Sequence, residues 1–260
     1  MPDFSTQATV LRTIDYGDGD KIVTLFSSGY GKIVTIAKGA KKSLKRFGGT
    51  LELFSLVDVV WSRGGRKGLP ILKEATIIKA FNRIRTDILK TAYACYWSEL
   101  IYKWMEEGQK HYPSFELLTQ ALSCLDKDEI DDDFLSILFQ AKFLAFCGFS
   151  PSLERCSVCQ KPLDAFSEKS IAFSFKKGGV ICLGCLGKEG DITLSKGTIK
   201  QLLWVLNTSL DRALRIRCSK ESKVEGSRFI EAFVVYCFER ELKSLQFLRE
   251  LRREGDGTDV

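Results

Sequence analysis

The feature that most constrains the fold is a change in the spacing of apolar residues at about residue 81. Before it, short runs rich in Val, Ile, Thr and Phe are separated by turns that contain glycine. After it, apolar residues recur every three or four positions, as on the buried face of a helix. A chain with these two patterns is expected to have an N-terminal part made of strands and a C-terminal part made of helices.

The first part predicts five short strands, at residues 8–13, 21–27, 32–37, 54–62 and 69–78. Five strands in about 80 residues favour a small closed or nearly closed barrel, such as the oligonucleotide-binding (OB) fold. The second part predicts helices at residues 87–107, 114–125, 131–146, 195–214 and 227–252. The expected fold is therefore a multidomain α+β chain, with an OB-fold β-barrel over residues 1–80 and a helical domain over residues 81–260.

Four of the nine cysteines form two CxxC pairs, Cys156 with Cys159 and Cys182 with Cys185, separated by 22 residues. Each pair can present two sulfurs to one ion, and four thiolates complete a closed tetrahedral site. We predict one structural zinc ion in a module inserted at residues 151–190, whose intervening segment forms a hairpin. A redox pair or unpaired core thiols are the alternatives. The other five cysteines are expected to be small buried side chains: Cys95, Cys124, Cys147, Cys218 and Cys237.

A local excess of positive charge follows the third predicted strand. Residues 21–51 contain no Asp or Glu, although the whole chain carries a net charge of only +6. Lysines and glycines in a loop suit the phosphate backbone of a nucleic acid; a solvated charged surface is the alternative. The candidate DNA-binding residues are Lys38, Lys41, Lys42, Lys45, Arg46, Arg63, Arg66 and Lys67.

Three other patterns are better explained by structure than by a binding site. The aromatic residues Tyr93, Tyr96, Trp97, Tyr102 and Trp104 have helical spacing, which favours core packing over base stacking. The segment from Asp15 through Asp18 to Asp20 has glycine at the third position of a calcium loop, so a turn is expected. The run Asp131, Asp132 and Asp133 suits a helix N-terminus better than a metal site.

Motifs of the common enzymes are missing from the sequence. The only histidine is His111, and neither GxxxxGK[ST] nor GxGxxG is present, so we expect a protein that is not an enzyme. An RNA-binding zinc-ribbon protein and a metal-dependent nuclease that uses only carboxylates remain alternatives. No secretory signal and no apolar run of about 18 residues is visible, so a cytoplasmic protein without membrane contact is expected.

Several segments resemble the bacterial recombination mediator family RecO, in the right order along nearly the whole chain. They are RTIDYGDGDKIVTLF at 12–26, GKIVTIAKGA at 31–40, RFGG at 46–49, the CxxC pairs after FSP at 149–151, and ELKSLQFL at 241–248. The cysteine pairs match the family's zinc-bearing members. One departure is LELF at 51–54, where the family often has a proline before the aromatic residue.

The resemblance implies an OB-fold barrel, a helical domain, a zinc module and a non-enzymatic role in recombinational repair in the bacterial nucleoid. RecO proteins bind single- and double-stranded DNA and anneal complementary strands. They associate with RecR, bind the acidic C-terminal tail of the single-strand binding protein, and help to load RecA. By motif, Lys38, Lys41, Lys42, Lys45 and Arg46 carry over as DNA contacts, and the four cysteines of the CxxC pairs as zinc ligands.

Overall fold

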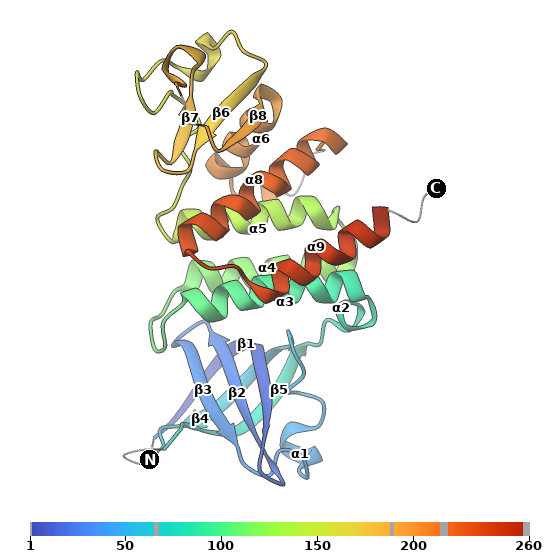
Figure 1. Ribbon diagram of the computed structural model, residues 1–260. Helices are drawn as coiled ribbons and strands as arrows, with labels where there is room; N and C mark the ends of the chain where they lie inside the picture. Colours follow the sequence, from blue (N-terminus) through green and yellow to red (C-terminus); the bar gives the residue numbers. More distant parts are fainter. Residues whose placement is uncertain (1, 65–67, 188–189, 214–217, 257–260) are drawn as a thin grey trace. The chain divides into compact units, whose positions relative to one another are not determined.

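A computed structural model describes residues 2–64, 68–187, 190–213 and 218–256 (Figure 1). Contacts divide the chain into two compact units, one formed by Met1–Lys127 with Leu242–Val260 and the other by Asp128–Glu241. The predicted domains at 1–80, 81–260 and 151–190 stay predictions. Within the described residues, no helix combines the length and the apolar character needed to cross a membrane.

The first unit begins with the five predicted strands, all of which are confirmed. They are β1 (Asp3–Tyr16), β2 (Asp20–Ser27), β3 (Gly31–Ala37), β4 (Leu56–Ser62) and β5 (Ile71–Lys79). They form a closed barrel in the order β1-β2-β3-β5-β4, with β4 pairing back to β1. The mixed α+β character predicted from the sequence is therefore present.

Two irregular features allow five short strands to close. Strand β1 pairs with β4 through its first part and with β2 through its second, and Leu11 is an extra residue in the β1–β2 ladder. Such a bulge bends the strand and increases its twist. On the other side, β3 pairs in parallel with β5 at Ile36 and Ile71, and the Ile36 N–H donates to the Pro70 carbonyl at 2.8 Å.

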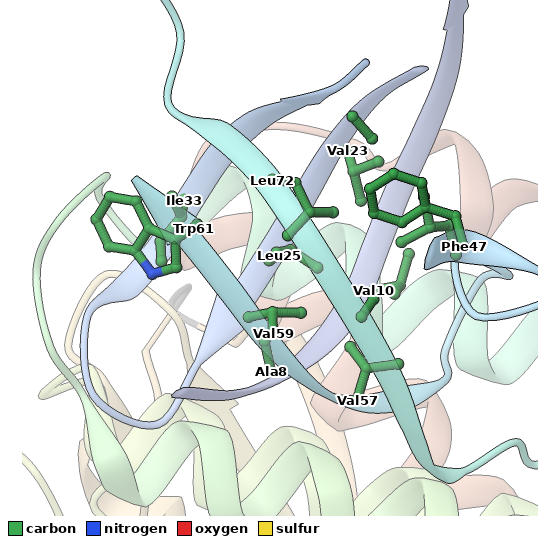
Figure 2. Close-up of a cluster of buried hydrophobic side chains, with 13 residues drawn as sticks. Ala8, Val10, Val23, Leu25, Ile33, Phe47, Val57, Val59, Trp61 and Leu72 are labelled. Carbon is green, nitrogen blue, oxygen red and sulfur yellow. The ribbon is translucent and has the colours of Figure 1, made fainter. Parts of the chain in front are cut away.

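Buried and partly exposed residues alternate along the strands, so that apolar side chains fill the barrel (Figure 2). Val23 and Leu25 from β2 meet Val57 and Val59 from β4, and all four are fully buried. The short helix α1 (Leu44–Phe47) adds Phe47, which is 4% exposed and belongs to the same cluster. The loop between β3 and β4 is thus anchored in the barrel core.

Four helices complete the first unit: α2 (Asn82–Thr86), α3 (Ile88–Trp104), α4 (Tyr112–Lys127) and α9 (Lys243–Asp256). Asp87 caps α3 by accepting the Leu89 and Lys90 N–H groups. Tyr93, Tyr96 and Trp97 on α3 are buried, which confirms core packing for these three residues of the aromatic stripe. Tyr102 and Trp104 are only half-buried.

The second unit combines helices with a small sheet. Its elements are α5 (Asp132–Phe146), η1 (Leu163–Ala165), β6 (Ser170–Ser174), β7 (Gly179–Ile181), η2 (Leu183–Cys185), β8 (Ile192–Ser195), α6 (Lys196–Asn207), α7 (Leu210–Ala213) and α8 (Lys220–Phe238). Asp131 caps α5, as expected for a run of acids at a helix start. Phe173 of β6 packs edge-on against Phe229 and Phe233 of α8, with ring centroids 4.8 and 5.6 Å apart.

Two helix predictions were wrong because a single helix was expected where two exist. The predicted helix at 195–214 ends as α6 at Asn207, where Thr208 is extended, and α7 follows. The predicted helix at 227–252 is broken at Glu239, which has a left-handed φ of 50°. Neither break contains Gly or Pro. Asn207, Thr208 and Ser209 are turn- and cap-forming residues, so only the break at Glu239 carried no local signal.

Gly31 at the start of β3 fixes the segment that follows α3 against the barrel. Its φ is +66°, and a Cβ at this position would lie 2.0 Å from the Gln109 carbonyl oxygen. The Gly108 N–H also donates to the Lys32 carbonyl at 3.0 Å. Only glycine fits this close approach of two backbones.

Gly31→Ala is therefore expected to lower the free energy of unfolding by about 2–4 kcal/mol, because it adds both a left-handed alanine and a steric clash. Denaturant unfolding of the full chain measures this. Gly19→Ala is the matched control: a Cβ there meets nothing nearer than the Lys42 Cε at 4.0 Å. Equal stability of the two variants would show that the contact at Gly31 is unimportant.

Candidate metal centre and nucleic-acid interface

Each CxxC pair lies on a tight turn. In the first, the Gln160 N–H donates to the Cys156 carbonyl at 3.0 Å, and Gln160 has a left-handed φ of 61°. In the second, the Cys185 N–H donates to the Cys182 carbonyl at 2.9 Å within η2. Both turns direct their two sulfurs to the same side, as in the knuckles of structural metal sites.

Strand β7 brings the two turns together. The β6–β7 hairpin confirms the predicted return of the chain, and β7 leads directly into Cys182. The Ser157 N–H, next to Cys156, donates to the Val180 carbonyl at 2.9 Å. A Cβ on Gly179 would lie 2.7 Å from the Ser152 carbonyl oxygen and 2.1 Å from the Ser157 Oγ, and the backbone contact requires glycine where the first turn meets the strand.

The four cysteine sulfurs lie within 4.8 Å of one another, and those of Cys159 and Cys182 are 3.6 Å apart. Sulfurs about 2.3 Å from an ion in a tetrahedron would be about 3.8 Å apart, so this cluster fits a metal ion. Among the described residues, it is the only group of three or more Cys, His, Asp or Glu side chains that could hold one. The calcium alternative at Asp15, Asp18 and Asp20 gains no support from the structure.

The charge on this cluster is unevenly distributed. Burial raises the pKa of Cys156, but N–H donors of Cys159, Cys182 and Val158 outweigh it and lower the pKa to about 6. The Cys185 thiol donates hydrogen bonds to Cys159 and Cys182, and these, followed by burial, raise the pKa of Cys185 to about 12. One thiolate is therefore stabilised by the backbone, and a divalent cation would stabilise the others.

The remaining cysteines have a different environment. Cys124 is buried, and the other four are half-buried. Burial raises the pKa of Cys147 to about 12 and that of Cys237 to about 11, so both are neutral thiols at neutral pH. This agrees with their prediction as packed side chains, although only Cys124 is as deeply buried as expected.

The basic loop, residues 38–46, follows the last residue of β3, and its five predicted DNA contacts are all exposed: Lys38, Lys41, Lys42, Lys45 and Arg46. The loop is held at both ends. The Gly39 N–H donates to the Asp20 carboxylate at 2.8 Å, and Phe47 directly after the loop is buried in the barrel core. The cations are thus presented on a fixed backbone.

The five cations differ in what they contact. The Lys41 Nζ pairs with the Asp15 carboxylate at 3.0 Å, and Arg46 donates to the Lys38 carbonyl at 2.8 Å. Both side chains brace the loop from within. The side chains of Lys38, Lys42 and Lys45 have no hydrogen bond or ion pair with any described residue. These three are the cations best placed to bind an external anion.

Arg63, a further predicted contact, does not join this loop among the described residues. Its guanidinium lies 5.5 Å from the centre of the Phe4 ring. Arg66 and Lys67 lie outside the described residues. Arg12 was not among the predicted contacts. Its Nη1 donates to the Tyr102 hydroxyl at 3.2 Å, and no local pattern indicates this contact because the two residues are 90 positions apart.

Comparison with known proteins identifies the family. The family model for the N-terminal part of recombination protein O matches residues 1–81, and the model for its C-terminal part matches residues 85–246. The chain belongs to the RecO family. Its role therefore lies in DNA repair and recombination.

Relatives named DNA repair protein RecO match over nearly the whole chain. The protein from Desulfatibacillum aliphaticivorans is 44% identical over 255 residues, which cover 97% of this chain and 99% of the relative. The one from Desulfosudis oleivorans is 38% identical over 258 residues, covering 97% and 99%. The resemblance to RecO inferred from the motifs is thus confirmed.

The cysteine cluster predicts a metal content of one ion per chain. Cys159→Ser and Cys182→Ser are each expected to reduce it to well below one, because each removes one of four ligands, and to lower the stability of the module. Metal analysis by mass spectrometry of freshly purified protein gives the result. Cys237→Ser, which removes a thiol outside the cluster, should keep the full content. A metal-free wild-type protein would contradict the site.

Proposed function

We propose that this RecO-family chain is a non-enzymatic DNA-binding mediator that binds single- and double-stranded DNA and anneals complementary strands. The observation that carries the proposal is the basic loop, which is anchored on a closed barrel and exposes its lysines to solvent. A five-stranded barrel with this loop at a strand end supports assignment to the OB fold, whose members bind oligonucleotides.

Annealing in this proposal needs no chemical step. Two strands repel each other through their phosphates, and cations between them screen that repulsion. Base pairing then supplies the driving free energy. Contacts to phosphates are independent of sequence and weaken with salt, which suits a protein that must release its product.

The metal in this proposal is zinc, with Cys156, Cys159, Cys182 and Cys185 as its ligands. Four thiolates leave no open coordination position, so zinc would stabilise the module rather than activate a substrate. The proposed interactions with RecR, with the acidic tail of the single-strand binding protein and indirectly with RecA come from the family, as does a cytoplasmic location at the nucleoid.

The roles of the loop cations can be separated by salt titration. The triple substitution of Lys38, Lys42 and Lys45 by Ala is expected to weaken binding to single-stranded DNA and to reduce the slope of log K against log salt by about 2, for three phosphate contacts. Lys41→Ala should change the slope less, because Lys41 is paired with Asp15. The control is Lys73→Ala, whose lysine pairs with Asp3 on the barrel.

Strand annealing tests the function itself. The full chain should accelerate pairing of complementary oligonucleotides coated with single-strand binding protein, and the triple variant should be strongly impaired while Lys73→Ala stays active. No acceleration by the wild-type protein would overturn the proposal. Equal activity of the triple variant would instead show that annealing uses another surface.

A further inference from the structure

A second group of cations converges on one aromatic ring in the first unit. Around Tyr102, in the last turn of α3, the charged groups of Arg12, Lys32 and Lys103 lie 5.7, 5.1 and 5.8 Å from the ring centre. These residues come from β1, β3 and α3. The fold therefore gathers positive charge here from three distant parts of the sequence.

The three cations are not equivalent. Lys32 is half-buried, and its Nζ donates to the Tyr102 carbonyl at 2.7 Å, so it stabilises the C-terminal end of α3. Arg12 and Lys103 are exposed, and both line a pocket of about 360 Å³ beside the ring. That volume lies within the range of roughly 300–1,000 Å³ found for small-molecule sites. Glu99 also lines the pocket, and its carboxylate accepts from the N–H and the hydroxyl of Ser244.

Two apolar side chains of this pocket come from residues with irregular backbone conformations. Leu11 is the extra residue of the β1 bulge, and Phe54 has a left-handed φ of 72°. Bulges re-aim side chains near functional sites, and a left-handed phenylalanine is strained. Both features contribute their residues to the same wall.

One buried polar group of the pocket has no partner. Ser98 lines it and is 4% exposed, and its hydroxyl makes no hydrogen bond within the described part of the chain. Buried hydroxyls without a partner are rare in folded proteins, so this one calls for an explanation. A ligand with a polar edge would supply the missing bond.

The pocket and the basic loop are connected along the chain. Residues 51–52 line a second pocket with Lys41 and Phe47, and residues 53–54 line the pocket at Tyr102. Along β1, Arg12 lies about 10 Å from Asp15, the partner of Lys41, and the two side chains leave opposite faces of the strand. Arg12, Ile14 and Tyr16 share one face of that strand, and Ile14 and Tyr16 are 40% and 55% exposed.

We propose that this pocket holds one nucleotide of a single DNA strand whose neighbouring phosphates bind the basic loop. The base would pack against Leu11, Phe54 and the Tyr102 ring, with Arg12 and Lys103 at its phosphates. The inference rests on the proposed function and adds a specific base-holding subsite to it. An acidic peptide shares the negative charge, but the exposed apolar face that leads to the loop favours a strand with stacking bases.

The test uses the full chain and labelled oligo-dT of about 12 nucleotides, within the roughly 4–16 that one such barrel covers. The double variant Arg12→Gln, Lys103→Gln is expected to bind at least about tenfold more weakly, with a salt slope lower by about 1.4. Ser98→Ala should bind roughly threefold to tenfold more weakly without losing stability, which a purely structural hydroxyl would not do. Lys73→Gln is the control.

Three results separate the hypotheses. If the wild-type protein does not bind the strand, the proposed function fails. If the triple loop variant weakens binding but the double variant and Ser98→Ala match the control, the nucleotide pocket is wrong and the proposed function stands. The nucleotide pocket would also be overturned if the wild-type protein binds an acidic peptide and the double variant loses this binding while it keeps its affinity for DNA.

Discussion

The parallel pairing of β3 with β5 is the interaction on which the first unit depends. It joins strands that are not neighbours in sequence, through Ile36 with Ile71 and the Ile36 N–H bond to Pro70. Without it the sheet would be open, and β3 would expose an unpaired edge. Because β3 ends one residue later at Ala37, the same pairing fixes where the basic loop begins.

The closed barrel also gives the loop its second anchor. Phe47 and Leu51 are each 4% exposed, and both belong to the barrel core. Bracing by Lys41 and Arg46 holds the backbone between these anchors, which leaves Lys38, Lys42 and Lys45 to face solvent. A loop ordered before binding loses less conformational entropy when it meets a polyanion.

Much of the fold could be predicted from the sequence because the signals are local. Glycine turns bounded the strands, Asp87 and Asp131 capped their helices, and the CxxC spacing indicated the cysteine cluster. The break at Glu239 could not be predicted, since no Gly or Pro marks it and glutamate favours helix. The pocket at Tyr102 was equally hidden, because Arg12 and Lys103 meet only through the tertiary fold.

We propose that the loop on the barrel is the surface that binds DNA. Hydrogen exchange of the full chain, with and without single-stranded DNA, tests it most directly because it reports on every backbone amide at once. We predict slower amide hydrogen exchange at residues 38–50 in the presence of DNA, and unchanged exchange in the β6–β7 hairpin next to the cysteine cluster. Protection confined to Asp128–Glu241, with none at residues 38–50, would contradict it.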